Sequence, residues 1–345
     1  MDDILLIFGV ASALFFAFMS GFRDGGNLIA ANVLSRSVAP QRALYLACAG
    51  ELLGPFVLGS AVAVTLGREV FDMSSLEGQA ALLCLCAAVV SATAWSLLTW
   101  WAGSPAGATH SLLGGLLGGF VAAFGLSGVI WSVGLAKILF VLFIVPIAGL
   151  VVSTLIKGLT KMHLSRSAEK HRKGQWLTLF VLSAGHGANN AQKATALITM
   201  MLLASGYLNS FEVPFWSVFC AAIALTLGVS IGAWKIVKIF GKKTFRITPA
   251  QSLVSQGSAG AAVLAACLLG GPVSANQTVK SSLLGASPAE RQRDTGGIVM
   301  KDIVVSWLVN FPGAAMTAAA LYWIAAGVLG HGMGSFERIM DFMGQ

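Results

Sequence analysis

Two opposite charges stand side by side at the end of a long apolar run. Residues 4–20 carry no charged side chain, and the stretch GFRDGGN at 21–27 then places Arg23 and Asp24 among three glycines. A charge at mid-membrane costs at least about 2.5–3.5 kcal/mol, so such residues usually face the protein interior or a watery pathway. Arg23 indicates an anion site, because a guanidinium fork matches tetrahedral oxyanions. A purely structural ion pair, of Arg23 with Asp24 or with Glu51, is the competing interpretation.

Further ionisable residues lie in or beside apolar runs, namely Glu51, Lys193 and Lys280. Lys193 is predicted either to line a pathway or to reach an interface with its long side chain. Lys280 is expected to have a structural role. His110 and His186 are expected to be buried and hydrogen-bonded. Neither has another His or Cys at ligand spacing, so no metal is predicted beyond a possible Na⁺.

The glycines at 21, 25 and 26 are predicted to interrupt the helix that carries these charges. The N-terminal end of a half-helix presents free N–H groups and a positive dipole, which favour an anion. Unwound carbonyls together with carboxylates favour a cation. Interrupted helices would therefore bring both kinds of group to one place.

The composition defines the environment of these residues. The chain has 345 residues, of which 56% are hydrophobic and only 10% charged, whereas a soluble domain is about one quarter charged. Several apolar runs approach the roughly 20 residues that a spanning helix needs. We therefore predict an all-α integral membrane protein. The net charge of +8 lies in a few clusters between apolar runs, which argues against nucleic acid as a partner.

The charge pattern also predicts a path through the membrane. Basic clusters around 36–42, 157–173, 235–246 and 291–301 are assigned to the cytoplasm, because Lys and Arg are enriched in cytoplasmic loops. The predicted crossings are 4–34, 43–66, 79–104, 105–123 and 131–156, and then 176–204, 214–234, 251–271, 272–286 and 302–328. Both termini fall outside, in a multi-pass protein of the cell membrane.

Five crossings in each half mean that the second half enters the membrane from the opposite side. This is the signature of two inverted-topology repeats. We predict an N-terminal repeat at 1–157, a basic cytoplasmic linker at 158–175 and a C-terminal repeat at 176–345.

The two halves also match in sequence. SPAGATHSLLGGLLGG at 104–119 corresponds to GPVSANQTVKSSLLGA at 271–286, and GFRDGGNLIAAN at 21–32 corresponds to HGANNAQKATA at 186–196. The first pair is rich in Gly and Ser and too short for ordinary spans, so re-entrant-like hairpins are predicted. Such segments at corresponding positions of two halves indicate a transport site.

With these motifs the chain resembles the inorganic phosphate transporter (PiT) family, which also includes sulfate permeases. That family carries a GANDxAN-type motif in each half, and each is followed by a PVSTTH-type hairpin. Here the motifs are 21–27 and GANNAQK at 187–193, and the hairpins are PAGATH at 105–110 and PVSANQ at 272–277. The resemblance covers nearly the whole chain. It implies a secondary transporter that moves phosphate with Na⁺ or H⁺ by alternating access, without a further cofactor and without enzymatic activity.

The resemblance also implies which residues form the site. Together with Arg23, the expected substrate-binding residues are Asp24, Asn27, Thr109, Asn189, Ser274 and Asn276. The expected coupling-ion residues are Asp24, Glu51, Asn27, Asn190 and Gln192. This chain departs from the family pattern at Arg23 (Asn in the family), Asn190 (Asp in the family) and Gln256, which takes the place of a glutamate. Fewer carboxylates weaken a full set of Na⁺ sites, and the added guanidinium favours an oxyanion.

Several alternatives remain open at this point. Phosphate carries a P–OH proton that needs an acceptor, which Asp24 and Glu51 supply, whereas sulfate would suit a site in which Arg23 already satisfies Asp24. The driving ion is either Na⁺ or H⁺. A transport-dead sensor or scaffold is a further alternative, and so is a membrane enzyme that pairs His110 or His186 with Asp24. Membrane lipids and a second copy of the chain are possible partners.

Overall fold

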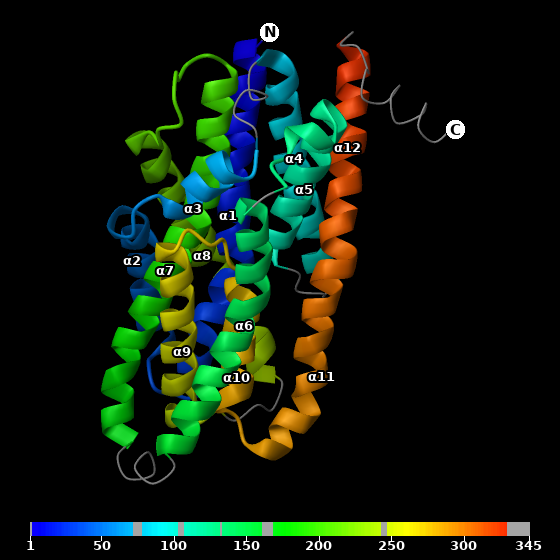
Figure 1. Cartoon of the computed structure of the whole chain (residues 1–345). Coiled ribbons are helices and arrows are strands. Elements are labelled where there is room, and N and C mark those ends of the chain that lie inside the picture. Colours follow the sequence, from blue (N-terminus) through cyan, green and yellow to red (C-terminus); the bar gives the residue numbers. More distant parts are fainter. Residues whose placement is uncertain are drawn as a thin grey trace.

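The computed structural model describes residues 2–71, 78–102, 107–131, 133–160, 168–242 and 247–329 (Figure 1). Within these ranges almost every residue is helical, which confirms the predicted all-α class. The first half forms α1 (Asp2–Leu34), α2 (Pro40–Val57), α3 (Ala61–Val64), the π-helical turn η1 (Thr65–Glu69), α4 (Gly78–Trp101), α5 (Ala108–Phe124), the 3₁₀ turn η3 (Leu126–Gly128) and α6 (Val133–Thr160). The second half forms α7 (Ala168–Ala204), α8 (Phe215–Lys242), α9 (Pro249–Leu268), α10 (Ala275–Ala286), α11 (Ala289–Val305), the π-helical turn η4 (Ser306–Asn310) and α12 (Phe311–Val328).

Five of the described helical segments are long and apolar enough to cross a membrane. A sixth forms if α2 and the α3–η1 segment count as one span, bent by 62° at residues 58–60. The protein is therefore a multi-pass membrane protein. Figure 1 shows α1 running away from the end of the molecule where α12 finishes, and α7 running back toward that end.

Helix α1 continues without a break through 21–27, so the prediction that glycines interrupt it is wrong. A Cβ atom added to Gly21 would collide with the backbone oxygen of Leu225 in α8, and one added to Gly228 would collide with that of Phe18 in α1. These glycines let the two backbones touch, as small residues do between membrane helices. Helix α7 is likewise continuous through 186–196.

The chain does break where the two hairpins were predicted. Helix α5 begins at Ala108 after the non-helical Gly107, and α10 begins at Ala275 after four non-helical residues at 271–274. Pro105 lies outside the described residues. Each hairpin therefore starts a new helix in the interior of the molecule.

The two halves interleave rather than sit apart. Helix α1 packs on α8 and α2 packs on α7, while α5 packs on α12 and α6 packs on α10. Exchanging the halves converts each contact into its counterpart, which is the pattern that two repeats would produce. Helices α6 and α7 both extend into 158–175, so the predicted linker is shorter than expected. Arg291, Arg293 and Lys301 lie on helix α11, and not in a loop as predicted.

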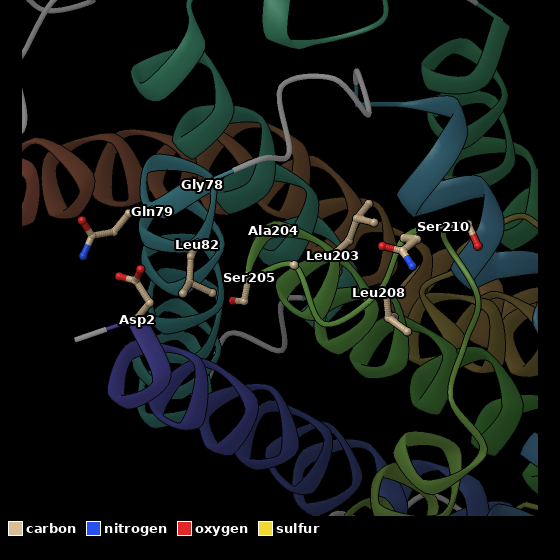
Figure 2. Close-up of a pocket in the computed structure, with 11 residues that line it drawn as sticks. Asp2, Gly78, Gln79, Leu82, Leu203, Ala204, Ser205, Leu208 and Ser210 are labelled. Atoms are coloured by element: carbon tan, nitrogen blue, oxygen red, sulfur yellow. The ribbon is translucent and has the colours of Figure 1, made fainter.

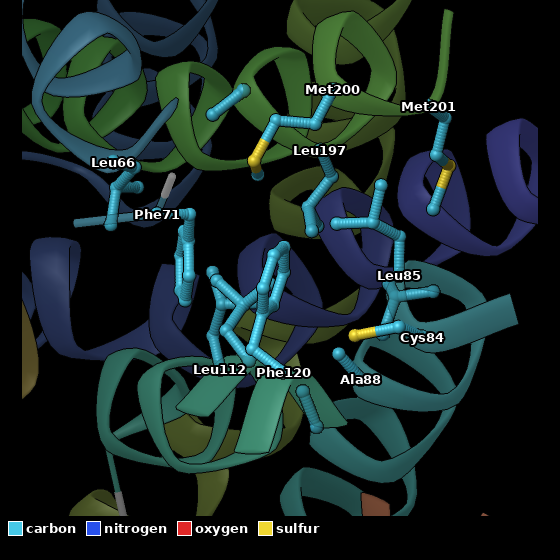
Figure 3. Packing of buried hydrophobic residues seen from close by; sticks show 14 of the residues in the cluster. Leu66, Phe71, Cys84, Leu85, Ala88, Leu112, Phe120, Leu197, Met200 and Met201 are labelled. Carbon is cyan, nitrogen blue, oxygen red and sulfur yellow. The ribbon is translucent and has the colours of Figure 1, made fainter. Parts of the chain in front are cut away.

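Apolar side chains of α4, α5, α7 and the α3–η1 segment form the largest core cluster (Figure 3). Phe71 stacks on Phe120 with ring centroids 4.0 Å apart, which adds about 0.5–1.5 kcal/mol beyond the buried area. Met200 and Met201 of α7 line the same cluster. Helix α5 packs on α4 and α12, and this packing helps to set the position of the first hairpin tip.

Candidate functional site

Most of the predicted site residues meet inside the molecule, where α1, α2 and α7 approach the beginnings of α5 and α10. Asn27 is half-buried, and the others are buried, namely Arg23, Asp24, Glu51, Thr109, Asn189, Asn190, Gln192, Ser274 and Asn276. A buried charge is costly unless it is paired or hydrogen-bonded. Their partners therefore determine what the site can do.

One group of partners joins α1, α2 and α7. Nδ1 of His186 lies 2.6 Å from Oε1 of Glu51, and Nε2 of the same ring lies 3.8 Å from Oδ2 of Asp24. His186 and Glu51 are both fully buried. The imidazole thus stands between two carboxylates. A proton in this group can be held by Glu51, by His186 or by Asp24. The expectation that His186 is buried and hydrogen-bonded is confirmed.

A second group centres on Lys193 of α7, whose side chain is buried. Its Nζ donates to Oγ1 of Thr109 at 2.7 Å, to Oδ1 of Asn190 at 3.0 Å and to the backbone oxygen of Val273 at 3.0 Å. The interpretation that Lys193 reaches an interface is therefore wrong. Lys193 instead connects α7 with both hairpin tips.

Two asparagines hold the second hairpin. The amide of Asn189 donates to the oxygen of Gly271 at 3.1 Å and accepts from the backbone N–H of Val273 at 3.2 Å. Asn27 donates to Oδ1 of Asn276 at 3.0 Å. Through these bonds, residues of both predicted motifs contact the non-helical segment before α10 or the first turn of that helix.

The two hairpin tips also touch each other. The hydroxyl of Thr109 donates to the oxygen of Val273 at 2.8 Å. A Cβ atom on Gly107 would lie 2.5 Å from Oγ of Ser274 and 3.0 Å from Nδ1 of His110, so a larger residue here would displace the Ser274 side chain. The ring of His110 stands edge-on to Trp307 of η4, with centroids 4.9 Å apart.

Several buried polar atoms around these tips accept or donate no hydrogen bond within the described residues. They are Oδ1 of Asp24, Oε2 of Glu51, Oγ of Ser274, both ring nitrogens of His110 and both amide atoms of Gln277. Buried polar groups are nearly always paired with protein, water or a bound group. A buried region with this many uncommitted donors and acceptors is suited to a small polar solute. His110 is buried as expected but lacks the expected hydrogen bond in the described part of the chain.

Two glutamines are committed elsewhere. Gln192 accepts from the backbone N–H of Val62 at 2.7 Å and donates to the sulfur of Cys267 at 3.5 Å, beside the bend between α2 and α3. Gln256 donates to the oxygen of Leu28 at 2.7 Å and so ties α9 to α1. Both amides fix helices at the edge of the site.

Lys193 and His186 were absent from the predicted site, although both stand in the second motif. A charged residue within an apolar helix was the available signal for Lys193. His186 gave a weaker signal, because a buried histidine is common and its carboxylate partners lie on α1 and α2. Lys280 has the expected structural role, since its Nζ pairs with Oδ2 of Asp302 at 2.7 Å.

A separate bowl of about 710 Å³ opens at the end of the molecule where α1 begins (Figure 2). Its lining comes from the first turns of α1 and α4, the end of α7 and the loop at 205–210. Asp2 is the one charged side chain in that lining. Among the described residues that line it, the bowl therefore offers no cation to an anionic solute, and none of the predicted site residues lies there.

Charged side chains buried between two interleaved halves, beside two helix-starting hairpins, define a membrane transporter rather than an enzyme. The model of the phosphate transporter family matches residues 20–318. The chain belongs to this family.

Similar proteins agree in length and architecture. A "probable low-affinity inorganic phosphate transporter" of Rhizobium meliloti is 33% identical, covering 93% of this chain and 96% of the relative. One of the same description from Bacillus subtilis is 31% identical, covering 93% and 98%. A solved structure described as "the sodium-dependent phosphate transporter" has a TM-score of 0.84 at 22% identity and covers 93% of this chain and 99% of that one. That structural likeness establishes the fold.

Proposed function

We propose that this protein carries inorganic phosphate across the cell membrane by alternating access, driven by a coupled cation. The observation that carries the proposal is the meeting of Lys193 with both hairpin tips in one buried region. A buried positive charge beside an uncommitted hydroxyl and an uncommitted amide suits a tetrahedral oxyanion. Relatives that cover almost the whole chain bear the name of phosphate transporters.

Phosphate is favoured over sulfate by the uncommitted acceptors. Oδ1 of Asp24 and Oε2 of Glu51 accept no hydrogen bond from the described residues. A P–OH group would give a proton to such an oxygen, while sulfate would leave it unpaired and would be repelled by its charge. Sulfate remains the alternative substrate in the test below.

We propose H⁺ as the driving ion. The chain of Glu51, His186 and Asp24 consists of three titratable groups in succession, and such chains serve as proton relays in transporters. Na⁺ is the second candidate, because the uncommitted carboxylate oxygens are also suitable ligands for a hard cation. The predicted coupling residues Asn27 and Asn190 would join the site in either case.

The matching contacts of the two halves support alternating access. A solute at the hairpin tips would lie between the α1–α8 and α2–α7 pairs, and rocking of one pair against the other would open the site to each side in turn. We place the basic clusters in the cytoplasm and both termini outside. Accessibility of N- and C-terminal epitope tags in intact cells tests this orientation, and a tag protected until the cells are permeabilised would overturn it.

Uptake of radiolabelled phosphate into proteoliposomes tests the proposal. We expect uptake under an imposed pH gradient, with little loss under excess unlabelled sulfate. A response to the Na⁺ gradient alone would replace H⁺ by Na⁺, and uptake abolished by sulfate would replace the substrate. Phosphate binding without uptake under either gradient would favour a transport-dead sensor.

The substitution Arg23→Gln tests the role of the guanidinium, and we expect it to weaken phosphate affinity. Unchanged affinity would favour the interpretation of Arg23 as part of a structural ion pair.

A further inference from the structure

We infer that the ammonium of Lys193 is a built-in cation, occupying an oxygen cage that would otherwise need a free monovalent cation. The inference rests on the proposed function, since it concerns the charge balance of the same site. The cage consists of Oγ1 of Thr109, Oδ1 of Asn190 and the backbone oxygen of Val273, at 2.7, 3.0 and 3.0 Å from Nζ. These three oxygens form the Lys193 cage.

The bonding pattern fits the charged form of the lysine. An ammonium has three N–H groups and no acceptor, and the Lys193 cage supplies three acceptors. A neutral amine would need a donor facing its lone pair. The hydroxyl of Thr109 has an acceptor of its own in the backbone oxygen of Val273, at 2.8 Å. The three acceptors therefore suit an ammonium at this fully buried position.

The ligands of this ammonium are the kind that bind metal cations. A hydroxyl, an amide oxygen and a backbone carbonyl are neutral oxygens, and rings of such oxygens replace the hydration shell of monovalent ions in channels. None of the three is a carboxylate, so the charge of Lys193 is not cancelled by a direct ion pair in the described part of the chain. An arriving anion would find one positive charge already in place.

The location of the cage gives this charge a role in transport. Its oxygens come from the first turn of α5, from α7 and from the segment before α10, so one cation holds both hairpin tips against α7. A transporter that relied on free cations for this task would have to bind one for each substrate carried. A tethered ammonium is retained through the cycle, and one fewer cation has to move with the anion.

Two substitutions separate a cation site from a simple structural contact. Lys193→Ala removes the ammonium and its stem and leaves the three oxygens facing an unfilled space. Lys193→Met is the matched control, because it fills the same space with an uncharged chain. The purified variants are unfolded thermally in detergent with NaCl, KCl, methylammonium chloride or choline chloride at equal ionic strength.

We expect the Ala variant alone to gain a saturable rise in Tm with a small cation relative to choline, on the order of 3–5 °C at saturation. The wild type and the Met variant should not respond. Methylammonium should also restore phosphate uptake in the Ala variant and not in the Met variant. If the Ala variant is too unstable in choline chloride for a melting curve, its purified yield is compared instead. A higher yield with a small cation than with choline is then the expected result.

Two outcomes have distinct meanings. If Ala and Met variants lose stability equally and neither responds to any small cation, Lys193 is only a structural contact and the inference is overturned. If the Ala variant responds but the wild type neither binds nor carries phosphate, the Lys193 cage stands while the proposed function fails. The thermal measurement uses no phosphate, so the two failures remain distinguishable.

Discussion

At the scale of single residues, Glu51 provides the sharpest test of the driving ion. Glu51→Gln keeps the shape and a hydrogen-bonding oxygen for His186 but removes an exchangeable proton. We expect uptake driven by a pH gradient to fall at least about tenfold, while exchange of internal for external phosphate stays within about twofold. Exchange moves no net proton, and saturating phosphate on both sides offsets the loss of the acceptor that Glu51 offers to the P–OH group.

The matched control for Glu51→Gln is Glu212→Gln, which makes the same change at an exposed position in a loop. Its uptake and exchange should both equal those of the wild type. Equal loss of uptake and exchange in Glu51→Gln would contradict a coupling role and would assign Glu51 to the general stability of the site.

The sequence predicts which residues of this site are buried better than it predicts their partners. Arg23, Asp24 and Glu51 are charged residues within apolar runs, and all three are buried as expected. The partner of Glu51 lies 135 residues further along the chain. Helical spacing relates residues three or four apart, so it carries no information about such a contact. Lys193 was similarly ambiguous, because a long lysine stem fits either an interface or a cage.

At the scale of helices, the contact between α1 and α8 depends on glycine. In Gly228→Val the new side chain would collide with the backbone of Phe18. We expect a loss of about 1–3 kcal/mol or more through overpacking, measured as a lower Tm in detergent. Gly327→Ala on α12 is the control, since a Cβ there meets no atom within 4 Å. A Tm for Gly228→Val equal to that of the wild type would contradict this close packing.

The bend between α2 and α3 depends on Gln192. Replacement by Leu leaves the buried N–H of Val62 without its acceptor, at a cost of about 1–3 kcal/mol. We expect Tm to fall while the dependence of uptake on the driving ion stays unchanged. The opposite result, an altered ion dependence at normal Tm, would favour the predicted role of Gln192 in coupling. Gln79→Leu, at the rim of the bowl, is the control substitution.

The prediction that glycine interrupts a helix is wrong in α1 and correct at the hairpins, and both results have one physical reason. In water, glycine weakens a helix because it costs backbone entropy. Between membrane helices the same missing side chain lets backbones approach, and the helix continues. At Gly107 a Cβ would meet Ser274 and His110 in the non-helical tip itself. The residue type is the same in both places, and only the surrounding structure distinguishes the two roles.

At the scale of the whole molecule, neither half has a complete set of packing partners. Helix α1 packs on α8, α2 on α7, α5 on α12 and α6 on α10. We expect residues 1–160 or 168–345, expressed alone, to yield aggregated or degraded protein, because each exposes buried charges and small-residue faces. Co-expressed halves should copurify through a tag on one of them. A monodisperse N-terminal half, judged by size-exclusion chromatography, would contradict this interleaving.

The path of the chain was more predictable than its contacts. The alternation of basic clusters and apolar runs predicts an N-terminal half and a C-terminal half that begin at opposite ends, and α1 and α7 do run in opposite directions (Figure 1). Hydropathy and charge act locally on each segment as it meets the bilayer. Which helix packs on which depends on shape complementarity across the whole molecule, and no local pattern encodes it.

During biosynthesis, Glu51 is made well before its partner His186. The ribosome adds about 5–20 residues per second, so the 135 residues between the two take roughly 7–27 s to appear. During that interval the first half of the nascent chain enters the membrane while Glu51 still lacks His186 as its partner. Protonation of Glu51, or hydration by nearby water, would lower the cost of leaving this carboxylate unpaired until His186 is made. The protein's fate at the translocon would then depend on how soon the second half arrives, and slowed elongation between the halves would lower the yield of folded transporter.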